Sequence, residues 1–190
     1  MASGIETEVK ISLARVKDLA DRVHAAGLRV SLPRVFEANT LYDTPDQALR
    51  RAASILRVRE AGDRVLLTWK ARRDSRNHKS REELETAVES GAALHQILAQ
   101  LGYSPVFRYE KYRTEFKNEA DPCGLVMLDE TPIGDFLEIE GPAEWIDATA
   151  QRLGFTPEDY IVDSYGALYA ADCRRRGVEP ANMVFPSHSM

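Results

Sequence analysis

The chain of 190 residues has little cysteine, no long hydrophobic run and no excess of basic residues. Its two cysteines, Cys123 and Cys173, cannot form a disulfide framework and lack metal-ligand spacing, so we expect reduced thiols. No apolar stretch approaches the length of a transmembrane helix. The first residues lack the basic and apolar regions of a secretory signal. We therefore expect a cytoplasmic protein.

The charge balance disfavours a general nucleic-acid-binding protein, because such proteins normally carry a basic excess on one face. Here the formal net charge is −5 at pH 7. A small anionic ligand is not excluded, because local charge placement decides its binding. The length and the 44% hydrophobic content predict one globular domain with its own core. We expect this domain at residues 1–177, followed by a tail at 178–190, in a monomer or a homodimer.

Charged residues alternate with apolar ones in several segments that have the composition of strands. Near the N-terminus, Glu6, Glu8 and Lys10 occupy every second position. Val9 stands between Glu8 and Lys10, and Ile11 follows Lys10. Successive side chains of a strand point to opposite faces, so the three charges share one face. The same alternation recurs at Arg57 and Arg59, at Arg81, Glu83 and Glu85, at Lys111, Arg113 and Glu115, and at Glu138 and Glu140.

The order of expected elements repeats once along the chain. Strand patterns lie at 4–12, 34–42, 54–60, 64–71, 80–88, 106–117, 124–130 and 135–140, and helical patterns at 14–26, 91–101, 142–153 and 164–176. Each half runs strand, helix, strand and hairpin. Eight antiparallel strands that close into a barrel would leave no exposed edge. We predict an α+β fold: an eight-stranded antiparallel closed β-barrel, a tunnel with a polar lumen, flanked by helices.

The charged strand faces would line this lumen, while the apolar faces would pack under the helices. Removing each ion from water costs several kcal/mol even after relaxation, unless it is paired or bound to a metal. Acids and bases in such numbers therefore indicate a solvated cavity for charged ligands. That surface could hold a polyanion together with its metal ions.

An ordered set of short motifs accompanies this pattern. The motifs are Glu6-x-Glu-x-Lys10, Asn39-Thr-Leu-Tyr-Asp43-Thr, Leu56-Arg-Val-Arg59, Thr68-Trp-Lys70, Arg81-x-Glu-x-Glu85, Lys111-x-Arg113, Asp129 and Glu138-x-Glu140. Through them the chain resembles the CYTH, or triphosphate tunnel metalloenzyme, superfamily from residue 5 to about residue 170. Its members include inorganic, thiamine and RNA triphosphatases and class IV adenylate cyclases.

The resemblance implies a role for each charged position. Carboxylates supply the hard oxygen ligands that Mg²⁺ or Mn²⁺ prefers, and the implied metal ligands are Glu6, Glu8, Asp129, Glu138 and Glu140. Cations would grip the phosphate chain, and the implied substrate-binding residues are Lys10, Arg57, Arg59, Lys70, Arg81, Lys111 and Arg113. The implied catalytic residues are Glu6, Glu8, Lys10, Glu83 and Glu85.

Three functions fit this reading. The first is metal-dependent hydrolysis of inorganic triphosphate, thiamine triphosphate or a nucleoside triphosphate. The second is an adenylate cyclase that converts ATP to cyclic AMP and pyrophosphate, for which the sequence reveals no adenine site. The third is a polyphosphate- or nucleotide-binding module without turnover, which the complete acidic set disfavours. Tyr165 is expected to pack against the domain, with a substrate contact as the alternative.

Overall fold

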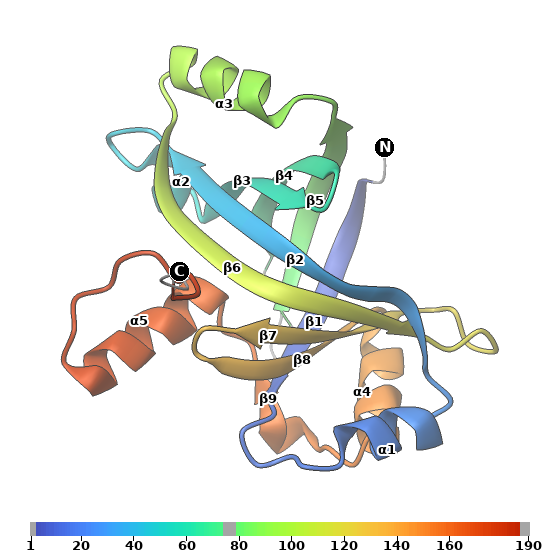
Figure 1. Cartoon of the computed structure of the whole chain (residues 1–190). Coiled ribbons are helices and arrows are strands. Elements are labelled where there is room, and N and C mark those ends of the chain that lie inside the picture. Colours follow the sequence, from blue (N-terminus) through green and yellow to red (C-terminus); the bar gives the residue numbers. More distant parts are fainter. Residues whose placement is uncertain (1–2, 74–78, 187–190) are drawn as a thin grey trace.

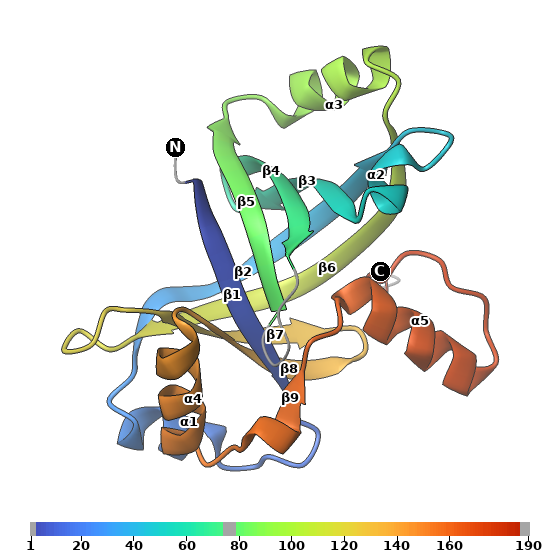
Figure 2. The same cartoon turned by 180° about the vertical axis from the view of Figure 1, so that it is seen from behind.

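The structure, a computed structural model, describes residues 3–73 and 79–186. Its strands are β1 (Ser3–Ser12), β2 (Arg29–Asp43), β3 (Ser54–Ala61), β4 (Arg64–Arg73), β5 (Lys79–Val88), β6 (Ser104–Lys117), β7 (Leu125–Thr131), β8 (Gly134–Glu140) and β9 (Tyr160–Ile161). Its helices are α1 (Leu19–Ala25), α2 (Ala48–Arg51), α3 (Gly91–Gln100), α4 (Ala143–Arg152) and α5 (Tyr165–Arg176), with a 3₁₀ turn at Pro157–Asp159. Figures 1 and 2 show them from opposite sides.

The strands β1 to β8 form the predicted closed antiparallel barrel. Their order is β5-β4-β3-β2-β6-β7-β8-β1, and β1 pairs with β5 to complete the ring. The N-terminal half of β1 runs beside β5, where Glu6 is the partner of Arg81, and its C-terminal half runs beside β8, where Lys10 is the partner of Glu138. The short β9 adds to β1 near Lys10. The predicted fold is therefore confirmed.

The largest apolar core lies outside the barrel, under α1 and α4. Val9 and Ile11 of β1 and Leu137 of β8 point outward and pack with Ile146 and Leu153, and all five are almost fully buried. These apolar residues alternate with the charged residues of the same strands. The alternation therefore separates a dry layer beneath the helices from a charged lumen.

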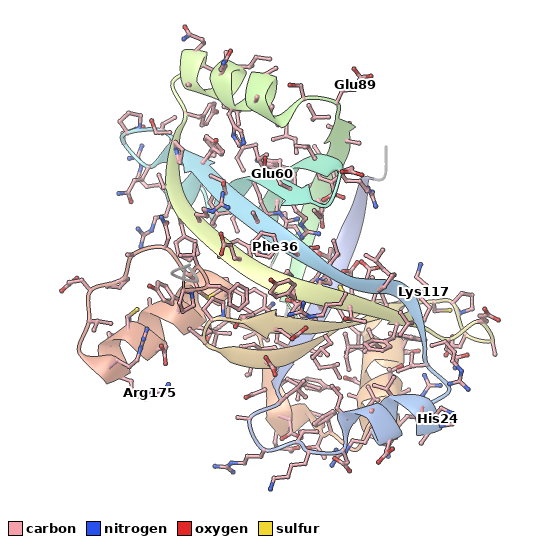
Figure 3. All side chains as sticks on the ribbon, in the orientation of Figure 1. His24, Phe36, Glu60, Glu89, Lys117 and Arg175 are labelled. Carbon is pink, nitrogen blue, oxygen red and sulfur yellow. The ribbon has the colours of Figure 1, made fainter. Side chains whose placement is uncertain are left out.

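Two smaller apolar clusters cover the rest of the barrel. Leu94 and Leu98 of α3 pack on Tyr42 and Val58. Figure 3 labels Glu89 in the link to α3 and His24 on α1, at opposite ends of the molecule. A third cluster joins α5 to β6 and β8. No helix in the described ranges is long and apolar enough to cross a membrane.

The two largest differences from the predicted boundaries are at the starts of α1 and β2, each displaced by five residues. The first helix starts at Leu19 rather than at residue 14. Its first helical hydrogen bond runs from the backbone N–H of Arg22 to the backbone oxygen of Asp18, directly before Leu19. Strand β2 starts at Arg29 rather than at residue 34. Its early part contains Pro33, and the pairing with β6 shifts register on both sides of Leu32. Proline cannot donate to the ladder and is tolerated at such irregularities, which explains why the pattern there is weak.

The segment 178–186 lies along β6, although residues 178–190 have no periodic pattern; residues 187–190 lie outside the described ranges. Met183 is fully buried and forms a parallel bridge with Tyr109. Its backbone N–H donates to the oxygen of Arg108, and its oxygen accepts from the N–H of Glu110, both at 2.9 Å. Strand β7 pairs only with residues 112–116 of β6. The segment therefore covers the part of the β6 edge that β7 leaves unpaired.

Candidate functional site

The lumen contains two cavities, of about 120 Å³ and about 320 Å³. Both are lined by Glu6, Arg57, Arg59, Lys70, Arg113 and Glu140. Because these residues form a shared wall, we describe the cavities as two ends of one passage. One end opens beside α5, where Ser164, Tyr165 and Gly166 line it. The other end, which we call the far end, is lined by Glu83, Glu85 and Glu115.

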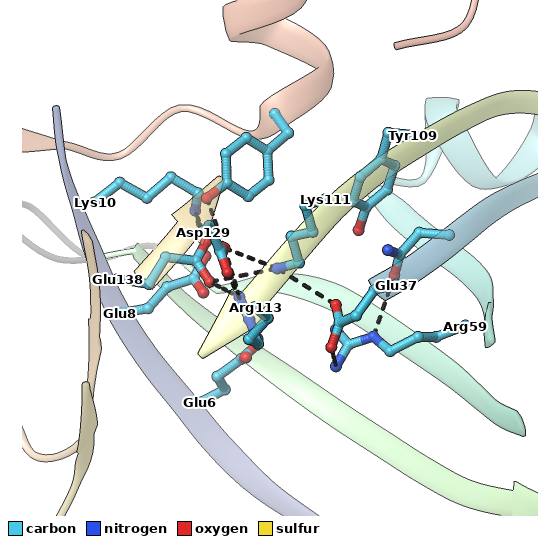
Figure 4. Close-up of polar contacts among 12 residues, drawn as sticks. Glu6, Glu8, Lys10, Glu37, Arg59, Tyr109, Lys111, Arg113, Asp129 and Glu138 are labelled. Carbon is cyan, nitrogen blue, oxygen red and sulfur yellow. Dashed lines mark hydrogen bonds and ion pairs between the residues drawn. The ribbon is translucent and has the colours of Figure 1, made fainter. Parts of the chain in front are cut away.

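A buried ion cluster joins β1, β6 and β8 (Figure 4). The ammonium group of Lys10 lies 2.9 Å from Glu138 Oε1 and 3.1 Å from Glu8 Oε1. Arg113 donates to a carboxylate oxygen of Glu138. Burial alone would raise the pKa of Glu138, but attraction by Lys10, Lys111 and Arg113 holds that pKa well below its ordinary value. Glu138 is therefore ionised and attracts three cations from two strands, β1 and β6.

Asp129 of β7 is fully buried behind this cluster. Arg113 donates to both of its oxygens at 2.7 Å, and Lys111 donates at 2.8 Å. The hydroxyl of Tyr165, at the start of α5, donates to it at 2.7 Å. Asp129 is not among the described residues that border either cavity. It thus fixes the side chains that do border the passage.

A second ion cluster lies on β1, β4 and β5. Lys70 Nζ approaches Glu6 Oε2 at 2.6 Å and Glu83 Oε2 at 2.9 Å. On the same wall, Arg57 Nη2 lies 3.6 Å from Glu85 Oε2, which also accepts a hydrogen bond from Thr68 at 2.8 Å. Each acid of this wall therefore has a basic neighbour.

Glu37 and Asn39 of β2 are site residues that carried no predicted role. Glu37 lies 3.6 Å from both Arg59 and Lys111, and Asn39 Oδ1 accepts from Arg59 Nε at 3.1 Å. Burial alone would raise the pKa of Glu37, but attraction by Lys111 and Arg59 lowers it to about 2. In the sequence, the alternation of Glu37 with Asn39 could have indicated an inward polar face on this strand. Their pairing with Arg59 and Lys111 depends on the register of β2 with its neighbouring strands, which the sequence does not give.

Two buried guanidinium groups present an unused donor. Arg57 Nε and Arg81 Nε are inaccessible to solvent and have no hydrogen-bond acceptor among the described residues. Both side chains line the passage. A buried donor left unsatisfied costs roughly 1–3 kcal/mol. An anion in the passage would supply the missing acceptors once each guanidinium group turns its Nε toward it.

A divalent cation fits the other side of the passage. Glu8 and Glu140 face one another in the pairing of β1 with β8. Burial, followed by repulsion from Glu6, raises the pKa of Glu140 to about 7. Carboxylates crowded in this way carry more negative charge than the neighbouring Lys10 and Lys70 offset, and their oxygens are the ligands that Mg²⁺ and Mn²⁺ prefer. Within the described ranges no three acids already converge as a metal site, so binding requires Glu8 or Glu138 to turn from Lys10.

Glu140→Gln is expected to stabilise the metal-free protein at pH 8. The raised pKa means that the folded state holds a proton that the unfolded state loses between pH 4.5 and about 7. Stability therefore falls as the pH rises through this window, by about 3 kcal/mol in total. Glutamine cannot titrate, so the variant should gain that amount above pH 7 and nothing below pH 4.5. Denaturant unfolding of the wild-type protein and of Glu140→Gln, at pH 8 and below pH 4.5, measures the difference in the free energy of unfolding.

The outcome with metal provides the control for this variant. Mg²⁺ or Mn²⁺ should raise the melting temperature of the wild-type protein more than that of Glu140→Gln, because a bound ligand stabilises by mass action. Equal stability of the two metal-free proteins at pH 8 would contradict the crowding of carboxylates around Glu140.

Every predicted site residue except Asp129 lines the passage. The α5 end holds Glu8, Lys10, Arg81, Lys111 and Glu138, and the far end holds Glu83 and Glu85. Tyr109 and Tyr165 also line the α5 end. Tyr109 was not predicted, and Tyr165 was expected to pack against the domain. The ring of Tyr165 indeed packs on Tyr109 and Phe136, and its hydroxyl group donates to Asp129.

A closed antiparallel barrel with interleaved acids and bases in its lumen defines a charged-tunnel protein. The sequence model of the CYTH domain matches residues 4–160, and the chain belongs to this family. Proteins with this domain are usually enzymes, either triphosphatases or cyclases, and the tunnel metalloenzymes among them use divalent metals.

Individual relatives agree with this assignment. A protein of Methanocaldococcus jannaschii, whose name proposes adenylate cyclase activity, is 25% identical over 85% of this chain and 96% of its own length. A Vibrio parahaemolyticus structure with a similar name has a TM-score of 0.76 at 20% identity, covering 88% of this chain and 98% of that one. A Hippeastrum adenylyl cyclase homologue, described as having a dominant triphosphatase activity, has a TM-score of 0.60 at 15% identity, covering 93% and 97%. The two structures support the fold.

Proposed function

We propose that this protein is a metal-dependent triphosphatase that binds a small triphosphate in the passage. The observation that carries the proposal is the pair of buried guanidinium donors, Arg57 Nε and Arg81 Nε, that lack an acceptor in the described part of the chain. Phosphate oxygens are suited to them, because guanidinium binds phosphate through parallel N–H donors. Both side chains line one passage, so a chain of phosphates can contact both guanidinium groups once they turn their Nε donors toward it.

The remaining cations would neutralise the phosphate chain along the passage. Lys10 is fully buried, and although burial alone lowers the pKa of an ammonium group, attraction by Glu138 and Glu8 raises the pKa of Lys10. It therefore stays protonated. Lys70, Lys111, Arg59 and Arg113 are held by carboxylates that orient them toward the lumen.

We assign the metal-holding role to Glu6, Glu8, Glu138 and Glu140. A bound Mg²⁺ or Mn²⁺ would neutralise phosphate charge and polarise the phosphorus under attack. Asp129 would act through its neighbours instead, since it holds Lys111 and Arg113.

Glu83 or Glu85 would orient the attacking water. Burial, opposed by Lys70 and reinforced by Glu6, raises the pKa of Glu83 above its ordinary value. A carboxylate with a raised pKa accepts a proton more readily, which suits a general base near the terminal phosphate. Among the described residues that line the passage, Ser164 is the one serine, cysteine or histidine, and its hydroxyl oxygen accepts a hydrogen bond from the N–H of Ala167 at the start of α5.

Adenylate cyclase activity is the second candidate. One observation favours it: Leu41, Ile55, Phe107 and Tyr109 give the α5 end an apolar wall on which a flat base could stack. In that reaction the ribose 3′-hydroxyl attacks the α-phosphorus and pyrophosphate leaves. The same cations would serve both reactions.

Product analysis separates the two candidates. Inorganic triphosphate, thiamine triphosphate and ATP are offered in parallel with Mg²⁺ and with Mn²⁺. We expect phosphate release, with no cyclic AMP from ATP. Cyclic AMP formed at the rate of ATP loss would establish the cyclase instead. Tight triphosphate binding without turnover under any divalent metal would reduce the protein to a binding module.

A further inference from the structure

The two ends of the passage differ in charge. The residues that line only the α5 end include Lys10, Arg81 and Lys111 as well as the acids Glu8 and Glu138. The residues that line only the far end, by contrast, are Glu83, Glu85, Glu115, Leu125 and Met127, which include acids but no base within the described ranges. A phosphate chain that enters beside α5 therefore passes from a basic region toward an acidic one.

Glu115 has no assigned role in the proposed reaction. It follows Lys111 and Arg113 on the inward face of β6, and Figure 3 labels Lys117 at the end of this strand. Lys70 and Arg57 lie near Glu83 and Glu85. In the parts of the chain that the structure describes, the backbone of Glu115 pairs with β2 and β7, but its carboxylate forms no ion pair or hydrogen bond. Arg57, Arg59, Lys70 and Arg113 also border the cavity at the far end, but each already pairs with another carboxylate. The carboxylate of Glu115 therefore adds a negative charge to the far end without an ion pair of its own.

Arg57 marks how far an anion is expected to reach. Its unused Nε donor is buried, while its Nη2 lies 3.6 Å from Glu85 and 3.9 Å from Glu83. A phosphate that satisfies this donor lies beside the acids of the far end. A further phosphate in the same direction would enter the cavity that Glu85 and Glu115 line. Like charges brought together in a partly enclosed passage repel strongly, because screening by water is weaker there.

We propose that Glu85 and Glu115 limit the length of the phosphate chain that the passage accepts, so that it selects triphosphate over longer linear polyphosphates. This inference rests on the proposed function. It assigns Glu115 to specificity, by repulsion of the fourth phosphate rather than by attraction of the third.

The test is Glu115→Gln, which removes the charge and keeps the shape. We measure kcat/KM for linear inorganic triphosphate and tetraphosphate with Mg²⁺. The ratio of tetraphosphate to triphosphate should rise about tenfold in the variant. Glu82→Gln is the matched control, because Glu82 lies on the opposite face of β5 from Glu83 and lines neither cavity. Its ratio should equal that of the wild-type protein.

A second arm uses the wild-type protein alone. Raising the salt concentration should reduce its discrimination against tetraphosphate, because screening weakens the repulsion. An unchanged ratio of tetraphosphate to triphosphate kcat/KM in Glu115→Gln would overturn the inference, and so would discrimination that is insensitive to salt. In either case, triphosphate hydrolysis by the wild-type protein would still support the proposed function. A loss of Mg²⁺ affinity in Glu115→Gln would also overturn it, by assigning Glu115 to metal binding.

The proposed function can fail separately. If the wild-type protein hydrolyses no triphosphate with any metal, calorimetry compares the dissociation constants of triphosphate and tetraphosphate for the same variants. A selective gain in tetraphosphate affinity in Glu115→Gln would support the inference without turnover. No selective gain would overturn it.

Discussion

Glu138→Gln is expected to lower kcat for the preferred triphosphate by about 10³-fold, the size of effect that loss of one preorganised charge produces in an active site. Glu138 contacts Lys10 and Arg113 and, like Glu8, lines the α5 end of the passage, on the side to which we assign the metal. Glutamine has the same shape but cannot balance these cations or bind a divalent ion as strongly. Steady-state kinetics over a range of Mg²⁺ and Mn²⁺ concentrations measures the loss.

Two further variants make this result specific. Glu8→Gln should lose activity to a similar extent, because Glu8 faces Glu140 across the β1–β8 pairing. Glu82→Gln, outside the passage, should keep the activity of the wild-type protein. Near wild-type turnover in both Glu8→Gln and Glu138→Gln would refute the metal assignment.

Asp129→Asn is expected to destabilise the protein by roughly 3–5 kcal/mol, the usual cost of leaving buried charges without their partner. Asp129 is fully buried and accepts hydrogen bonds from Lys111, Arg113 and Tyr165. An amide keeps the size of the side chain but removes the negative charge. Denaturant unfolding at pH 7 measures the change in the free energy of unfolding.

Tyr165→Phe serves as the matched comparison for Asp129. It removes one hydrogen bond to the same carboxylate and keeps the ring, so about 1 kcal/mol should be lost. If Asp129→Asn cost no more than Tyr165→Phe, the two cations would not depend on Asp129 for their charge balance. Asp129 would then be available for another role.

The barrel and most of the passage could be predicted because period-two alternation records which face of each strand is charged. The pattern is strong at Glu6, Glu8 and Lys10, and at Glu138 and Glu140. It is weak where β2 is irregular around Pro33, and the start of that strand was therefore missed. Alternation reports a face, and it does not report the partner across the lumen.

The roles of Glu37 and Asp129 illustrate that limit. Glu37 stands in a strand of mixed polar and apolar residues, and its partner becomes known only when β6 brings Lys111 beside it. Asp129 faces inward as expected, but Tyr165, 36 residues later, closes over it from α5. Contacts between distant elements decide whether an inward acid borders the passage or lies behind its wall.

The pairing of β1 with both β5 and β8 has a consequence for how the protein folds. The Lys10–Glu138 ion pair joins residues at nearly opposite ends of the domain, so it cannot form until the chain has been synthesised through β8. Long-range pairing of this kind slows folding, because a large loop must close before any contact is gained. A nascent chain that ends before β8 therefore carries an incomplete barrel with an open edge on β1. Ring closure and assembly of the charged passage become one late event on the folding pathway, and a partly closed barrel has no intact site.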